Sequence, residues 1–338
     1  MRACECHNKA ARQRQSLNGG LARLCEANRT ATARTMSAAQ FIETVLKGLR
    51  RASPRTSRAI FYIAAPDYTY MHSGIRCLHL LCHHLNRLGY RAHVSTQVTN
   101  PDLDTPYADD AMLDQSRRAG LIDIVIYPEV VAGNPLNAKR VVRYLLNKPG
   151  YFTGVGMETY GSGDFFVHFA DEFAPPGKNS LRLRIPLVDQ DIYRLPEKTN
   201  PRATFAIYSE RYRPNTECFP PWITNQEIVS RSAPRTPKAL SDLYQKSRAL
   251  ITGERTAACM EAIHCGCPVI MIPHDDFDHK PIVDFYRGYG FCIGFDMDSL
   301  SRATTTTHLA RRKYRWLVRT LDQSIHAFAR GACRHFDV

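Results

Sequence analysis

One stretch of the sequence decides the fold: Ala249–Pro273, which reads ALITGERTAACMEAIHCGCPVIMIP. Two short apolar runs, Ala249–Thr252 and Val269–Ile272, flank a segment of helical character, Ala257–Cys265. Gly266 is suited to end that helix, because glycine adopts a positive φ at little cost. Two buried strands joined by a helix of this length form a parallel, right-handed crossover unit. The stretch therefore predicts an α/β protein with a parallel sheet.

The turn Gly253–Thr256 is a candidate phosphate site. It follows the first strand at its carboxyl end, where parallel sheets bind ligands and helix N-termini face outward. Its backbone N–H groups, the Thr256 hydroxyl and the Arg255 guanidinium are suited to a diphosphate. Glu261 lies one turn into the helix, where its carboxylate is placed to accept hydrogen bonds from a ribose. The pattern predicts a nucleotide site.

These residues resemble the donor-binding segment of GT-B glycosyltransferases. That segment carries an acidic residue, a polar turn and a second glutamate followed by Ala-x-x-x-Gly-x-Pro-Val. Glu254, Thr256, Glu261 and the run from Ala262 to Val269 match it. Six residues separate the two glutamates, one fewer than in the common retaining-type signature, so Glu261 fits the signature better than Glu254. The alternative is a doubly wound protein of another function with a Gly-Cys-Pro turn.

Length and composition limit the classes of function. The chain has 338 residues, 44% of them hydrophobic, which is enough for two domains with real cores. The formal charge of +13 favours a nucleic acid, an anionic membrane surface or acidic substrates such as nucleotide sugars. No basic-aromatic motif of the nucleic-acid-binding type is recognised, which disfavours nucleic acid. No apolar run approaches the roughly 20 residues of a membrane span.

The cysteines indicate a reducing compartment and no metal. There are 11, an odd number, and most lie in apolar contexts, which is typical of reduced, buried thiols in the cytosol. The run Cys4-Glu5-Cys6-His7 has the spacing of half a zinc site, but no second half follows. We therefore expect no metal and no cofactor.

The patterning divides the chain into four parts. Residues 1–36 are basic and poor in apolar residues, which predicts a disordered extension, and Met36 is an alternative start. Residues 37–190 predict a Rossmann-like acceptor domain and residues 200–300 a Rossmann-like nucleotide-sugar domain, the two facing a cleft. Residues 301–338 predict a terminal helix that crosses back to the first domain.

The first domain opens with a strand at Ala59–Ala65, a helix at Ile75–Leu88 and a strand at Arg91–Ser95. The loop between the first two lacks G-x-G-x-x-G, which argues against a dinucleotide oxidoreductase. The run Ser73–Arg76, the leucine-rich helix with Asn86 and the turn Leu88-Gly89-Tyr90 together resemble the opening of bacterial GT-B transferases, in which a Gly-containing loop faces the interdomain cleft. The resemblance implies acceptor-side residues at His72, as a possible base, Ser73, Gly74 and Arg76.

In the stretch Tyr127–Gly150, Asn134-Pro135-Leu136 leads into a predicted helix that ends at Lys148-Pro149-Gly150. This arrangement resembles a stretch of polysaccharide-assembly transferases. A strand at Leu121–Tyr127 is followed by a loop with Glu129 and Asn134, a predicted helix at Ala138–Leu146 and a predicted strand at Tyr151–Val155. Both loop residues lie at the carboxyl end of a strand and are expected to face the cleft. Glu129 is a candidate catalytic carboxylate; the alternative is a capping or structural role.

The second domain begins with a strand at Ala203–Tyr208, and two arginines, Arg211 and Arg213, follow its carboxyl end. In GT-B enzymes this turn commonly supplies a basic residue to the donor diphosphate, and guanidinium groups pair well with phosphate oxygens. The alternative is a solvated charged loop. A helix at Pro237–Lys246 and a strand at Phe291–Phe295 complete the predicted domain.

Together these features predict a GT-B glycosyltransferase that moves a sugar from a nucleotide-activated donor to a saccharide or lipid-linked acceptor. The resemblance implies bacterial envelope polysaccharide or lipopolysaccharide synthesis in the cytoplasm. Arg211, Arg255 and Thr256 would neutralise the leaving diphosphate in place of a metal. The basic segment Arg311–Arg319 predicts peripheral contact with anionic lipid at the inner membrane. Two alternatives stay open: a sugar-nucleotide epimerase of the same fold and a basic polyanion-binding module.

Overall fold

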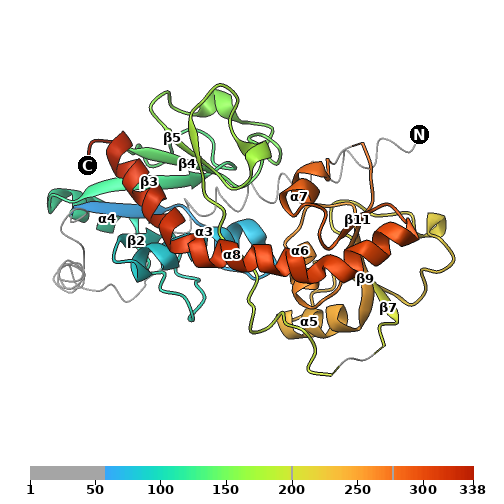
Figure 1. Cartoon of the computed structure of the whole chain (residues 1–338). Helices are drawn as coiled ribbons and strands as arrows, with labels where there is room; N and C mark the ends of the chain where they lie inside the picture. The colour runs from blue at the N-terminus through green and yellow to red at the C-terminus, as the bar shows by residue number, and fades with distance from the viewer. Residues whose placement is uncertain (1–57, 199–200, 276–277) are drawn as a thin grey trace. The chain divides into compact units, whose positions relative to one another are not determined.

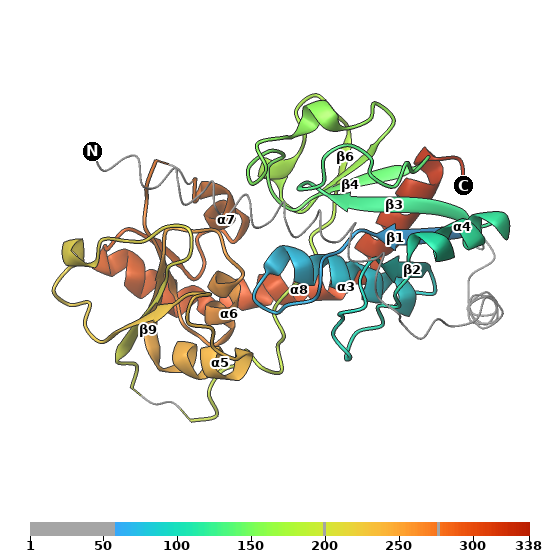
Figure 2. The same ribbon diagram turned by 180° about the vertical axis from the view of Figure 1, so that it is seen from behind.

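The computed structural model describes residues 58–198, 201–275 and 278–338. The predicted extension over residues 1–36 and the first part of the predicted acceptor domain, residues 37–57, lie outside them. The described chain divides into two compact units, each with one parallel sheet (Figures 1 and 2). The first unit comprises residues 58–68, 78–184 and 322–338. The second comprises residues 69–77 and 185–321, so a short segment of the predicted acceptor domain belongs to it.

The sheet of the first unit has the strand order β2-β1-β3-β4-β5-β6, and every neighbouring pair is parallel. β1 pairs with β2 on one side and with β3 on the other, so the sheet grows in both directions from its first strand. The strands are β1 (Ala59–Ile63), β2 (Arg91–Val94), β3 (Ile122–Pro128), β4 (Val141–Leu145), β5 (Phe165–His168) and β6 (Ser180–Arg182).

The sheet of the second unit is also parallel, with the order β11-β10-β9-β7-β8. The strands are β7 (Thr204–Tyr208), β8 (Gln226–Val229), β9 (Ser247–Thr252), β10 (Val269–Met271) and β11 (Phe291–Ile293). Two parallel sheets with interleaved helices confirm the prediction of an α/β protein with two Rossmann-like domains. The crossover predicted from Ala249–Pro273 is β9, helix α6 (Ala258–His264) and β10.

Apolar side chains cover both faces of the second sheet. On β7, Phe205 and Ile207 pack into one core, while Ala206 between them packs into another. Because side chains alternate across a strand, burial of both sets requires cover on both faces. This explains why the central strands read as continuous apolar runs.

Helices connect the strands. They are α3 (Ser73–Arg87), α4 (Asp110–Arg118), α5 (Pro237–Lys246), α6, α7 (Lys280–Phe285) and α8 (Met297–His335). Neither α4 nor α7 was predicted from the sequence. The 39-residue helix α8 contributes its residues up to Leu321 to the second unit and those from Asp322 to the first. Among the described helices, none is both long and apolar enough to cross a membrane.

Two secondary-structure predictions are wrong. The segment Ala138–Leu146, predicted as a helix, contains strand β4, which is buried along its whole length between β3 and β5. A short, continuous apolar run has no periodicity to separate helix from strand, and sheet pairing decided the outcome. The segment Tyr151–Val155, predicted as a strand, forms turns. Gly150, just before this segment, and Gly154 within it have φ of 79° and 73°, which lie outside the strand region.

Candidate active site

The candidate site lies at the carboxyl edge of the second sheet. β7 pairs with β8 on one side and β9 on the other, so the chain changes its direction of travel across the sheet between β7 and β9. Open parallel sheets bind ligands at such a switch point, outside the carboxyl ends of the strands. The loops that follow these two strands contain five of the residues predicted to bind the donor: Arg211, Arg213, Glu254, Arg255 and Thr256.

Glu254 joins the two loops. Its carboxylate is 3% exposed and accepts hydrogen bonds from the backbone N–H groups of Glu210 (2.8 Å), Arg211 (2.7 Å) and Tyr212 (3.0 Å). The Nε atom of Arg211 donates a fourth bond over 2.8 Å. Four donors, one of them charged, satisfy this carboxylate within the protein. Glu254 therefore shapes the β7 loop, and a ligand would have to displace these bonds to reach it.

Tyr212 covers the start of the β9 loop. A Cβ atom at Gly253 would overlap the Tyr212 ring, so this position requires glycine for space. The ring stacks on His274, which follows β10, with 4.0 Å between centroids and 5° between planes. The distance from Nε2 of His274 to the Gly253 carbonyl oxygen is 2.7 Å. The loops after β7, β9 and β10 thus form one packed edge.

The residues predicted to bind the diphosphate differ in how many hydrogen bonds they already make within the protein. Arg211 donates from Nη2 to the Arg255 carbonyl over 2.9 Å, in addition to its bond with Glu254, and its side chain is 34% exposed. The Thr256 hydroxyl accepts from the Ala258 N–H over 3.3 Å. Arg213 is exposed and has no hydrogen bond or ion pair with a described residue. Of this set, Arg213 is the guanidinium most available to an anion.

His72 lies in the second unit, beside the ends of β7 and β8. Its Nε2 atom accepts a hydrogen bond from Nη1 of Arg231 over 3.1 Å. Arg231 in turn donates its backbone N–H to Glu210 over 2.8 Å, and its Nε lies 3.6 Å from the same carboxylate. Burial first, and then the charge of Arg231, lower the pKa of His72, while Glu210 opposes them. His72 is therefore held as a neutral imidazole with its Nε2 lone pair engaged.

The segment around His72 packs on the second unit through two further residues. The Tyr70 hydroxyl donates to the Arg235 carbonyl over 3.2 Å. Arg76 donates to the Glu261 carboxylate over 2.9 Å and also to the Leu187 carbonyl. Ser73 is exposed and Gly74 half-buried, both in the first turn of α3. These contacts place the four predicted acceptor-side residues with the predicted nucleotide domain.

Glu261 is deeply buried. It lies in α6, is 5% exposed, and its Oε1 atom is bound by Arg76. Tyr193 lies close by: burial, and then the charge of Glu261, raise the pKa of its hydroxyl. The predicted contact of Glu261 with a ribose stays a prediction; it requires the carboxylate to exchange at least one of these neighbours for the sugar.

The two predicted site residues of the first unit are engaged by its backbone. Glu129, after β3, is 5% exposed and accepts the Leu146 N–H over 2.9 Å. Burial raises the pKa of this carboxyl to about 7, so at neutral pH it is partly protonated. Asn134 accepts the Ala138 N–H over 2.9 Å and donates to the Ala138 carbonyl over 2.8 Å. Both side chains thus stabilise the loop between β3 and β4.

Sequence reasoning missed four residues of the edge: Glu210, Tyr212, Arg231 and His274. Glu210 and Tyr212 flank the predicted Arg211, so their position after a strand was an available signal. Arg231 and His274 follow β8 and β10, and only the strand order brings them to the same edge. Among residues 58–198, 201–275 and 278–338, no three His, Cys, Asp or Glu side chains are grouped to hold a metal ion.

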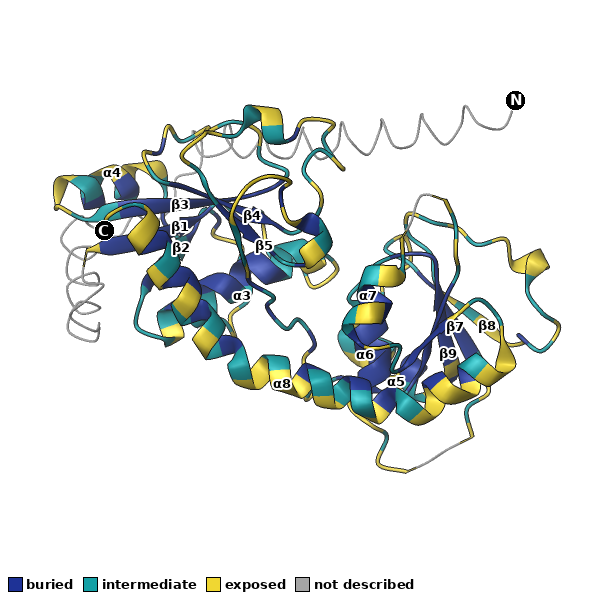
Figure 3. Ribbon diagram, turned by 45° about the horizontal axis from the view of Figure 1, so that its top comes forward, coloured by how far each residue is buried: buried dark blue, intermediate teal, exposed yellow. Residues whose placement is uncertain are grey.

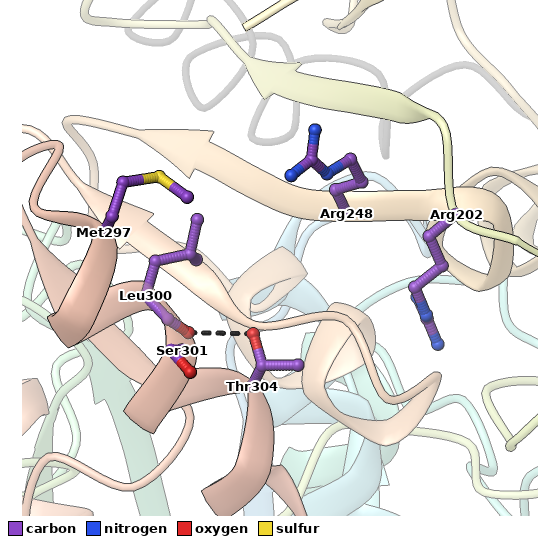
Figure 4. A pocket seen from close by; sticks show the side chains of 6 residues that line it. All are labelled: Arg202, Arg248, Met297, Leu300, Ser301 and Thr304. Carbon is purple, nitrogen blue, oxygen red and sulfur yellow. Dashed lines mark hydrogen bonds between the residues drawn. The ribbon is translucent and has the colours of Figure 1, made fainter. Parts of the chain in front are cut away.

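A depression elsewhere in the second unit is distinct from this edge. It has a volume of about 290 Å³ and lies beside Arg248 near the amino end of β9 and beside the first turns of α8 (Figure 4). Arg202 lines it too, but its guanidinium donates to the carbonyls of Tyr244, Ser247 and Cys265. Because this depression lies at the opposite end of β9 from Gly253, it is not part of the candidate site.

Comparisons with known proteins yield structural likeness alone. No family model matches the chain, and no curated protein matches it. Among solved structures, the chain is similar to the spinosyn rhamnosyltransferase SpnG complexed with thymidine diphosphate, at 12% identity and a TM-score of 0.38, covering 80% of this chain and 96% of that one. It is also similar to the calicheamicin glycosyltransferase CalG4, at 12% identity and a TM-score of 0.41, covering 82% and 99%.

A third similar structure is WaaG, a glycosyltransferase involved in lipopolysaccharide biosynthesis. The identity is 11% and the TM-score 0.37, with 81% of this chain and 98% of that one covered. At this level of similarity, the function has to be argued from the residues of the site.

Proposed function

We propose that the protein is a glycosyltransferase of the GT-B type, and that its second unit binds the nucleotide-activated sugar. One observation carries the proposal: Glu254 joins the loops after β7 and β9 at the switch point of a parallel sheet. That edge is where this architecture binds ligands. It presents the exposed Arg213 and the partly exposed Arg211, which fit the charge of a nucleoside diphosphate.

The leaving diphosphate is neutralised by arginine in this proposal, without a metal ion. Two negative phosphates develop further charge as the glycosidic bond breaks, and fixed positive groups stabilise that charge. Arg213 and Arg211 supply the guanidinium groups. The Arg255 backbone, to which Arg211 is bonded, and the Thr256 hydroxyl belong to the adjacent turn Gly253–Thr256. Glu254 acts by positioning Arg211, because it binds both the backbone and the side chain of that residue.

His72 is the proposed base that takes the proton from the acceptor hydroxyl. A base must be neutral before the reaction, and burial together with Arg231 keeps the pKa of His72 low. Its Nε2 atom is bonded to Arg231, so the acceptor hydroxyl has to replace Arg231 at that nitrogen. Arg231 would then be available to the diphosphate oxygens. The proposal leaves Glu129 a structural role, since its carboxylate is buried against backbone N–H groups.

The acceptor is proposed to be a saccharide or a lipid-linked sugar of the bacterial envelope, with the enzyme acting in the cytoplasm. This assignment rests on the resemblance of the Glu129 and Asn134 region to polysaccharide-assembly transferases and on the reduced character of the cysteines. All eight cysteines of the described residues are free thiols, and seven of these are buried.

A thermal-shift screen with UDP, GDP, dTDP, CMP and ADP tests donor binding. A nucleotide at about 100 times its Kd stabilises the folded state by about 2.7 kcal/mol, which gives a clear rise in Tm. Absence of stabilisation by all five nucleotides would contradict the proposal. The nucleotide that stabilises the protein then selects the donor for an assay in which its release must depend on an added acceptor.

A matched pair of variants locates the site. Arg213→Gln removes an exposed charge at the carboxyl edge of the sheet, whereas Arg248→Gln removes an exposed charge near the amino end of β9. We expect Arg213→Gln to reduce the nucleotide-induced shift and Arg248→Gln to leave it unchanged. Equal responses would mean that the nucleotide binds elsewhere.

A further inference from the structure

We propose that the solvent-facing side of α8 within the second unit docks on an anionic lipid bilayer. The relevant part of the helix runs from Ser299 to Leu321, where the sequence contains no aspartate or glutamate. It carries six basic residues, which are Arg302, Arg311, Arg312, Lys313, Arg315 and Arg319. A segment with this charge is attracted to any surface of opposite sign.

The helix separates buried from exposed residues (Figure 3). Its inner face contains Ala303, Thr307, Ala310, Tyr314 and Leu321, all of them buried. The outer face contains His308, Arg312, Arg315, Trp316 and Arg319, all of them exposed. Residues three and four positions apart are neighbours on a helix, so Arg312, Trp316 and Arg319 form one continuous strip. We call the outer-face residues the α8 strip.

The arginines of the strip are not engaged by the protein. Arg312, Arg315 and Arg319 form no hydrogen bond or ion pair with a described residue. Exposed lysines on the other helices of this unit behave differently, since Lys238 pairs with Asp242 and Lys280 with Asp284, each one turn further along. The strip therefore presents uncompensated positive charge, which is available to an external anion.

Trp316 identifies the partner as lipid. Trp316 is 56% exposed. An indole has an apolar body and a polar N–H group, and tryptophan is enriched where a helix lies at the boundary between head groups and acyl chains. The combination of cationic side chains with an exposed tryptophan fits a bilayer better than a nucleic acid, which would need stacking residues along a groove.

This surface lies outside the candidate site, and its test does not depend on glycosyl transfer. The full chain is mixed with vesicles of phosphatidylcholine alone or of phosphatidylcholine with phosphatidylglycerol, and the bound fraction is measured by sedimentation. We expect binding to the anionic vesicles only, weakening as salt is raised. Failure to bind anionic vesicles, or equal binding to neutral ones, would overturn the proposal.

The protein has only two tryptophans, so tryptophan fluorescence can report contact between the α8 strip and the bilayer. The other, Trp222, packs on Phe205 and Phe295, in the same apolar core of the second unit as Ile207. In a Trp222→Phe variant the fluorescence comes from Trp316 alone. Anionic vesicles should shift its emission to the blue, and brominated acyl chains should quench it. Binding without either change would place the contact elsewhere on the protein.

Two triple variants distinguish binding through the α8 strip from binding through the net charge of the whole protein. Arg312→Gln, Arg315→Gln and Arg319→Gln together remove three charges from the strip. Arg194→Gln, Lys238→Gln and Lys280→Gln remove three exposed charges elsewhere in the same unit. Each arginine near an anionic surface contributes roughly five-fold in affinity, so we expect the strip variant to lose roughly a hundred-fold. An equal loss in both variants would refute a dedicated surface.

A single-stranded oligonucleotide serves as the competing partner. If it binds more tightly than the anionic vesicles at physiological salt, and the strip variant abolishes that binding, the lipid assignment is wrong. The circular dichroism spectrum of both variants is compared with that of the original chain. Because glutamine is a good helix former, α8 is expected to stay folded.

Discussion

Arg76 donates a hydrogen bond to Oε1 of Glu261 over 2.9 Å, although 185 positions separate the two residues in the sequence. The guanidinium and the carboxylate are 13% and 6% exposed, so both charges depend on each other for compensation. This buried pair fixes the start of α3 to α6 within the second unit. The backbone N–H of Arg76 donates to the His72 carbonyl over 3.0 Å, which links this pair to the residue proposed as the base.

Removal of one partner should destabilise the second unit. Arg76→Met leaves Glu261 charged and buried, and we expect a loss of about 3 kcal/mol in the free energy of unfolding by urea. The double variant Arg76→Met with Glu261→Met removes both charges and should recover much of that loss. Lys280→Met, which breaks an exposed pair with Asp284, is the control and should change stability by less than about 1 kcal/mol. A strictly additive double variant would mean that the pair is not coupled.

Glu254 should control the shape of the donor loop. Glu254→Gln places an amide N–H₂ group against donors that now face a carboxylate oxygen, so we expect a loss of about 2 kcal/mol in stability. The variant should also lose nucleotide-induced stabilisation, because Arg211 is no longer held in position. Glu217→Gln, at an exposed position of the same unit, is the control. Normal nucleotide binding by Glu254→Gln would show that the loop does not need this carboxylate.

The pKa of His72 should respond in opposite directions to its two neighbours. Burial and Arg231 lower it and Glu210 raises it, so Arg231→Met should raise the pKa and Glu210→Gln should lower it further. Proton NMR of the imidazole as a function of pH measures both shifts, with the resonance assigned by its loss in His72→Gln. Shifts of the same sign in both variants would contradict the arrangement of these three side chains.

Glu129 should make stability depend on pH. Its pKa is about 7 in the folded protein, against an ordinary glutamate value of 4.5, so the folded state keeps a proton that the unfolded state releases. The stability contributed by the protonated carboxyl is fully present below pH 4.5 and is lost as the pH rises to about 7. This difference between the two pKa values corresponds to about 3 kcal/mol in the free energy of unfolding.

The measurement for Glu129 compares urea unfolding of the original chain and of Glu129→Gln across this pH range. Glutamine cannot ionise but can still accept the Leu146 N–H through its amide oxygen. Relative to this variant, the original chain should therefore become less stable between about pH 4.5 and 7. A difference that stays constant with pH would mean that Glu129 is ionised in the folded state.

The sequence determined the layout of the α/β fold to a large extent. The apolar runs at β1, β3, β7 and β9 are buried on both faces of a sheet, and such strands are recognisable without any knowledge of their partners. Helix α5 was predicted with its observed bounds. In the structure Thr236 caps it and Pro237 opens it, and both are local features of the chain. Strand β4 was missed because a buried helix and a buried strand share the same apolar run.

The sequence predicted which segments contain the residues of the candidate site, but not which of these residues contact one another. The glycine turn and the arginines after the strands are visible in the sequence, since a strand's carboxyl end follows from its direction. The tertiary structure alone decided that Glu254 organises the β7 loop, that Arg231 engages His72 and that Arg76 pairs with Glu261. The physical reason is that a buried charge takes whichever partner the strand order brings within hydrogen-bond distance, and sequence spacing does not encode that distance.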